Sequence, residues 1–99
     1  MARPKPLKAE DVLKIVSAAL ARGRVYPSNH IRQRMREHNF DINDAIQVLE
    51  NARDARPKWN MKSTTWNYDL DGKDIEGEKL TIRIAMTEDM NGVILVTGF

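Results

Sequence analysis

The sequence predicts an α+β domain in which two or three N-terminal helices pack on one face of a three- to four-stranded, mainly antiparallel sheet. Up to about residue 53, apolar residues recur every three or four positions, as in amphipathic helices. From Trp66 onward they alternate with polar residues, as in strands, and Asn91-Gly92 is a strong hairpin signal. We expect a flexible N-terminal arm over residues 1–8 and a single domain over residues 9–99.

Composition and charge restrict the class of protein. The absence of cysteine excludes a disulfide scaffold and a thiolate metal site, and it fits a cytoplasmic protein. We expect no signal peptide and no membrane span, because no apolar run is long enough for either. The net charge of +2 divides into +6 for residues 1–40, zero for 41–62 and −4 for 63–99. The cationic first part suits RNA, DNA or an acidic protein partner, although opposite charges can also attract each other within the fold.

The first predicted helix runs from about Ala9 to Arg22. It has acidic residues in its first turn and Gly23 after its last, and its apolar positions are spaced by three and four: Val12, Ile15, Val16, Ala19 and Leu20. Residues 24–27 are too short to be more than an extended connector or a small edge strand, and Pro27 fixes the exit.

Residues 28–49 predict two short helices joined by a tight corner. Ser28 is placed to cap the first helix, and Asn39 is suited to end it because asparagine tolerates positive φ. Asp41 then caps the second helix, with Asp44 three residues later in a capping-box-like pattern. We therefore interpret Asp44 as a structural residue.

The first of these helices carries the only two histidines of the chain. His30, Arg34 and His38 are four residues apart and form one stripe, next to the apolar stripe of Ile31 and Met35 that should face the core. A histidine at the edge of a buried face can be held in place and still meet a ligand. The alternative is a solvated basic face with a histidine packed at its margin.

The second half of the chain predicts the sheet. Residues 54–65 look like a basic loop around Trp59, which is able to stack on a nucleobase or to pack against a helix end. Strands follow over 66–70, 79–87 and 93–97, and Glu76-Gly77-Glu78 is the expected hairpin tip. In the middle strand Arg83 projects opposite the apolar face of Leu80, Ile82, Ile84 and Met86. It is a candidate anion contact, or it bridges to Asp69 or Asp71.

Two stretches carry a resemblance to a known family: His30-Ile-Arg-Gln-Arg-Met and Phe40-Asp-Ile-Asn-Asp-Ala-Ile-Gln-Val-Leu. They resemble a family of small bacterial domains of unknown function that is grouped with the RelE-like and BrnT-like toxins. The resemblance covers about residues 9–99. It implies a RelE-like α+β fold, with helices on one side of the sheet and a cleft on the other. It also implies a toxin-like endoribonuclease of a bacterial toxin–antitoxin system, which cleaves RNA through the neighbouring ribose hydroxyl without a metal ion.

Under that resemblance the catalytic candidates are His30, Arg34 and Arg83. An imidazole exchanges protons near neutral pH, and a guanidinium neutralises charge that grows on a phosphate. The candidates for holding the RNA strand are Arg32, Arg36, Lys58, Lys62 and Trp59. We expect no metal and no other cofactor, and we expect RNA and an antitoxin-like protein as partners. The alternative is a non-catalytic module that binds RNA, DNA or protein through the same basic surface.

Overall fold

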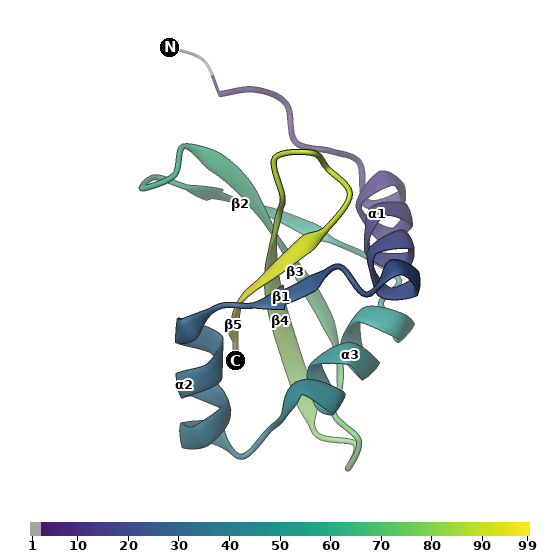
Figure 1. Ribbon diagram of the computed structural model, residues 1–99, viewed down its shortest axis with the longest axis vertical. Coiled ribbons are helices and arrows are strands. Elements are labelled where there is room, and N and C mark those ends of the chain that lie inside the picture. Colours follow the sequence, from purple (N-terminus) through teal and green to yellow (C-terminus); the bar gives the residue numbers. More distant parts are fainter. Residues whose placement is uncertain (1–2) are drawn as a thin grey trace.

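The computed structural model describes residues 3–99, which form three helices and five strands (Figure 1). Their order along the chain is α1 (Ala9–Arg22), β1 (Val25–Pro27), α2 (Asn29–His38), α3 (Ile42–Asn51), β2 (Arg56–Asn60), β3 (Thr65–Lys73), β4 (Lys79–Met86) and β5 (Val93–Gly98). The α+β class and the order of helices before the main strands are as predicted. No helix within residues 3–99 is long and apolar enough to span a membrane.

The five strands form one mixed sheet in the order β1-β5-β4-β3-β2. The short edge strand β1 runs parallel to β5, and the other neighbouring pairs are antiparallel. The predicted number of three to four strands was therefore too low. The additional strand is β2, which lies in the segment that the sequence presents as a loop. Its partner β3 imposes the extended conformation, because β2 itself carries Pro57 and cations instead of an apolar alternation.

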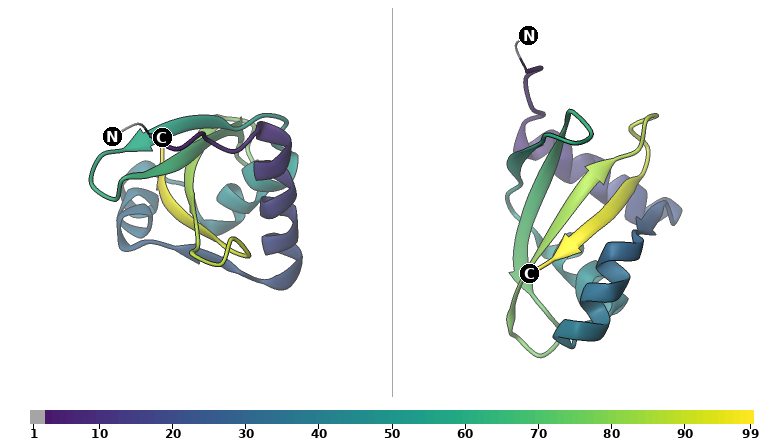
Figure 2. Two further views of the ribbon diagram at one scale, coloured as in Figure 1. Left: turned by 90° about the horizontal axis from the view of Figure 1, so that it is seen from above. Right: turned by 90° about the vertical axis from the view of Figure 1, so that its left-hand side faces the viewer.

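Helices α1 and α3 cover one face of the sheet, and α2 lies beside β5 (Figure 2, right). The predicted core face of β4 is confirmed, because Leu80, Ile82 and Ile84 are all buried. The buried helix residues that meet this face are Val12, Val16, Ala19, Ile31, Ala45, Val48 and Leu49. We call the opposite side of the sheet, away from α1 and α3, the open face.

The predicted helix ends are also confirmed. Gly23 and Asn39 both have positive φ, at 68° and 55°, after the last residues of α1 and α2. The Ser28 hydroxyl accepts a hydrogen bond from the backbone N–H of Ile31 at 3.1 Å. Asp41 and Asp44 form a complete capping box at the start of α3. These caps fix the corner that joins the end of α2 to the start of α3.

Candidate functional site

Two hydrogen bonds place α2 along the last residues of β5. The Ser28 hydroxyl donates to the carbonyl of Val96 at 2.9 Å, and Arg34 Nε donates to the carbonyl of Gly98 at 3.3 Å. His30 lies on α2 between these two anchors, and its side chain is exposed. The end of β5 therefore separates His30 on α2 from Arg83 on β4.

Arg34 and His38 line a hollow of about 390 Å³ between α2 and the β3–β4 turn. The same hollow is lined by three carboxylate side chains, those of Asp74, Glu76 and Glu78. His38 is half exposed, and its Nε2 lies 3.9 Å from the carboxylate of Glu37. Arg34 and Lys79 supply two cations against these three carboxylates, so a phosphate is less favoured in this hollow than in one without carboxylates.

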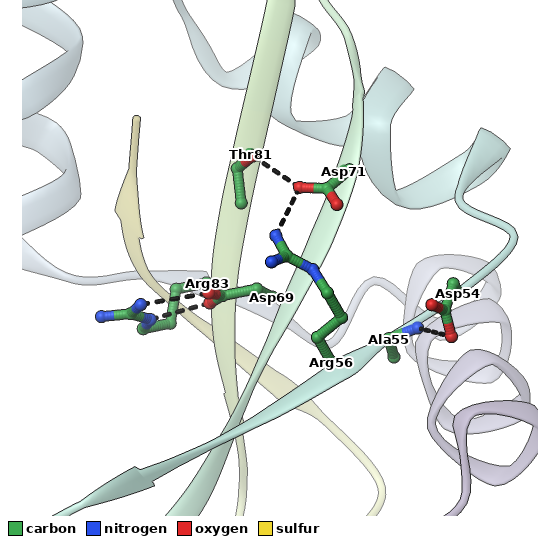
Figure 3. A network of polar contacts seen from close by, with 7 residues as sticks. All are labelled: Asp54, Ala55, Arg56, Asp69, Asp71, Thr81 and Arg83. Carbon is green, nitrogen blue, oxygen red and sulfur yellow. Dashed lines mark hydrogen bonds and ion pairs between the residues drawn. The ribbon is translucent and has the colours of Figure 1, made fainter.

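Arg83 is held by a buried carboxylate on the open face (Figure 3). Its Nε and Nη2 donate to the two oxygens of Asp69 at 2.7 and 3.1 Å. Asp69 is only 2% exposed. These hydrogen bonds raise the pKa of Arg83, although its partial burial opposes the effect. The predicted bridge to Asp69 is thus present, and among residues 3–99 no hydrogen-bond partner of Nη1 is found.

A second polar row crosses the open face next to the first (Figure 3). Arg56 on β2 donates to Asp71 at 2.8 Å, and the hydroxyl of Thr81 on β4 donates to the same carboxylate oxygen at 2.6 Å. The Thr81 hydroxyl and then Arg56 lower the pKa of Asp71. Arginine and aspartate therefore alternate across this part of the face, which leaves it close to neutral.

The cationic end of the open face lies at the β2–β3 hairpin. A hollow of about 280 Å³, the hairpin hollow, brings together four of the predicted residues, Lys58, Trp59, Lys62 and Arg83. Its other lining residues are Asn60, Met61 and Asn67. The hairpin hollow contains no carboxylate among these lining residues, in contrast to the hollow beside α2. His30 and Arg34 are not part of it.

The structure separates the other predicted cations from this site. Arg32 and Arg36 are exposed on α2. At about 100° per residue, they lie on the opposite flank of the helix from His30 and Arg34. The eight predicted residues therefore form three groups. The first lines the hairpin hollow, the second is His30 and Arg34 on the inner flank of α2, which faces the end of β5, and the third is Arg32 and Arg36 on the outer flank. Helical spacing in the sequence is enough to predict that the two flanks of α2 are separate. It cannot predict that the hairpin hollow is separate from α2.

Three further residues of this region were not predicted. Asn67 is buried in the hairpin hollow, Phe99 lies with its ring centroid 5.2 Å from Arg83 Cζ, and Arg3 Cζ lies 5.2 Å from the ring centroid of Trp59. Asn67 could have been found, because it precedes Asp69 by two residues and so shares its face of the strand. Arg3 and Phe99 meet residues that are far from them in the sequence, so no local pattern signals these contacts.

The chain matches no known family model, no curated protein and no solved structure. Within residues 3–99, no group of three or more histidine, aspartate or glutamate side chains is arranged to hold a metal ion.

Proposed function

We propose that this chain is a metal-independent endoribonuclease of the toxin type found in bacterial toxin–antitoxin pairs, with a RelE-like fold and an antitoxin-like protein partner. The observation that carries the proposal is the position of His30 and Arg34 on one side of the end of β5, with Arg83 on the other. A single RNA strand that crosses the end of β5 would meet an imidazole and two guanidinium groups.

Each group has a role that its surroundings permit. His30 is exposed and can take the proton of the ribose 2′-hydroxyl or give one to the leaving oxygen. Asp69 fixes the orientation of Arg83, whose Nη1 can then stabilise charge on the phosphate. Lys58 and Lys62 line the hairpin hollow, where their ammonium groups would bind the next phosphates of the strand.

A second function has its own support in the structure. The hairpin hollow groups Lys58, Lys62 and Arg83, whereas His30 lies outside it. Cations without a neighbouring acid or base are sufficient to bind a phosphate backbone, but not to cleave it. The second candidate is therefore a non-catalytic module that binds single-stranded RNA through the hairpin hollow.

A cleavage assay distinguishes the two functions. The purified protein is incubated with mixed single-stranded RNA in the presence of a chelator. If the chain is the proposed nuclease, it leaves cyclic or terminal phosphates and spares substrates with deoxyribose at the cleaved position. His30→Ala should slow cleavage by ~10²-fold or more, because it removes the proton-transfer group. His38→Ala is the matched control, and we expect less than a ~3-fold effect. Equal trace activity in all three proteins would indicate contamination and would remove the nuclease proposal.

A binding measurement locates the RNA-binding surface, whether the chain cleaves RNA or only binds it. We expect Lys58→Ala with Lys62→Ala to weaken binding and to lower the slope of log affinity against log salt by about 1.4, the value for two phosphate contacts with a single strand. The matched control, Arg32→Ala with Arg36→Ala, removes the same charge from the outer flank of α2. If the control has the larger effect, RNA binds along α2 and the hairpin hollow is not the site.

A further inference from the structure

The N-terminal arm, residues 3–8, leads into α1 and contacts the β2–β3 hairpin (Figure 2, left). The carbonyl of Pro4 accepts a hydrogen bond from Trp66 Nε1 at 2.7 Å. The backbone N–H of Leu7 donates to the Tyr68 hydroxyl at 3.0 Å. Together with Arg3 over the ring of Trp59, these contacts join the arm to three aromatic side chains of the hairpin.

The two tryptophans form one aromatic pair on the side of the sheet that α1 and α3 cover. Trp59 and Trp66 face each other across β2 and β3, with ring centroids 5.2 Å apart and ring planes at 72°. Trp66 lies on the same face as Tyr68 and Leu70, since side chains alternate along a strand. The arm therefore contacts the hairpin on the side opposite Arg83.

The arm has the chemistry of a segment that aromatic grooves recognise. Pro4 and Pro6 have fixed φ, and each restricts the residue before it to extended conformations. Such a segment loses little entropy when it binds, and its exposed carbonyls accept hydrogen bonds from the groove. The indole N–H of Trp66 supplies that donor, and the ring of Trp59 attracts the arginine cation.

We propose that the Trp59–Trp66 pair is a recognition site for a cationic, proline-containing peptide, and that the chain fills this site with its own arm. A separate peptide with the order Arg-Pro-x-Pro competes for the same site. The proposal does not depend on the nuclease or RNA-binding function, because it uses the other side of the hairpin. Trp59 is the one residue that borders both sites.

The first test is indole hydrogen exchange in the full chain, which has two tryptophans and hence two indole N–H signals in NMR spectra. The Trp66 signal should exchange at least ~10-fold more slowly than that of Trp59, because Trp66 is hydrogen-bonded to Pro4. Arg3→Ser with Pro4→Gly, the weakened-arm variant, should remove this protection. Lys5→Ser, which also removes a cation from the arm, should leave it unchanged. Equal exchange of both signals in the unmodified chain would overturn the proposal.

The second test adds the peptide Arg-Pro-Lys-Pro-Leu-Lys in trans. It should shift the Trp66 signal of the weakened-arm variant, and a peptide with glycines in place of the prolines should not. The unmodified chain should bind the peptide at least ~10-fold more weakly, since a tethered arm competes at an effective concentration of about 1 mM. Trp66→Phe in the weakened-arm variant, with folding verified by its melting curve, should lose binding by ~10-fold or more.

Two results of the second test would overturn the proposal. One is that the weakened-arm variant does not bind the peptide. The other is that a single-stranded RNA oligonucleotide shifts the Trp66 signal and the peptide does not, which would make the tryptophan pair part of a nucleic-acid site.

Discussion

Asp69 is a buried charge whose ion-pair partner is Arg83. Its side chain is 2% exposed, and Arg83 is about one-third exposed on the open face. The same arginine is thus a candidate for phosphate binding and a structural partner of a carboxylate. A loss of RNA cleavage or binding in an Arg83 variant has to be separated from a loss of folding.

We expect Arg83→Ala to lower the free energy of unfolding by ~1–3 kcal/mol. The usual cost of leaving a buried charge unpaired is reduced here because Arg83 is partly solvated. Chemical denaturation measures the change. Adding Asp69→Asn to Arg83→Ala should recover at least half of it, because the unpaired charge is then gone. If the double variant is no more stable than the single one, the ion pair does not hold this part of the sheet.

Asp44 joins the start of α3 to the turn between β3 and β4. One of its oxygens accepts from the backbone N–H of Ile75 at 2.9 Å, and the other accepts from that of Asp41 at 2.9 Å. The Ile75 bond, followed by the Asp41 bond, lowers the pKa of Asp44. A carboxyl with a lowered pKa in the folded state stabilises the fold above its unfolded pKa, and this contribution is lost as the pH falls through the folded value.

We therefore expect Asp44→Ala to lower the melting temperature in a pH-dependent way. The difference from the unmodified protein should be complete above about pH 5 and should shrink below about pH 4, close to the ordinary aspartate pKa. Thermal unfolding at low salt between pH 3 and 7 measures it. A difference that is constant over this range would show that the Asp44 charge contributes nothing through these hydrogen bonds.

At the scale of elements, the corner between α2 and α3 packs tightly against the end of β5. Phe40 is buried beside Gly98, and a β-carbon added at Gly98 would lie 2.6 Å from Phe40 Cζ. The carbonyl of Gly98 also receives the Arg34 side chain. The small residue at this position therefore allows α2 to lie close to the sheet.

Gly98→Ala should destabilise the protein by ~1–3 kcal/mol, because the new methyl group overpacks the contact with the Phe40 ring. Combining it with Phe40→Leu should cost less than the sum of the two single changes, since the smaller side chain makes room. Both quantities come from denaturant unfolding curves. Strict additivity would mean that Gly98 and Phe40 do not meet as described.

At the scale of the whole molecule, β4 is the central strand of the sheet, between β5 and β3. Ile82 is fully buried and lies between Leu70 on β3 and Gly98 on β5. Ile82→Ala should cost ~2–5 kcal/mol, as other truncations of buried aliphatic side chains do. Ile75, which is 60% exposed, provides a control whose change to alanine should cost less than about 0.5 kcal/mol. Equal effects in the two variants would contradict the order of layers.

The charge asymmetry of the sequence does not produce a single cationic surface in the folded molecule. Three arginines of residues 1–40, namely Arg32, Arg34 and Arg36, are divided between the two flanks of α2. Arg83, from the acidic third part, lies in the hairpin hollow with Lys58 and Lys62. The net charge of a segment favours a polyanion as a partner, and this stays a prediction. It did not predict where the cations meet.

The sequence alone determined the features that depend on neighbouring residues. The helix caps at Ser28, Asn39 and Asp41 need only a few residues of context, and the buried side of β4 follows from alternation. The predicted stripe of His30 and Arg34 also lies on one flank of α2, because helical spacing fixes it.

Only the tertiary structure decided which segments meet. In the folded chain Arg56–Asn60 pairs with β3 as a strand, and β1 pairs in parallel with β5. Arg83 binds Asp69 and not Asp71, and the arm contacts Trp66. The tertiary structure also put the end of β5 between His30 and the hairpin hollow. The reason is that every residue except proline offers the same backbone N–H and C=O groups to a neighbouring strand, so a local pattern shows which side of a strand is buried but not which strand lies beside it.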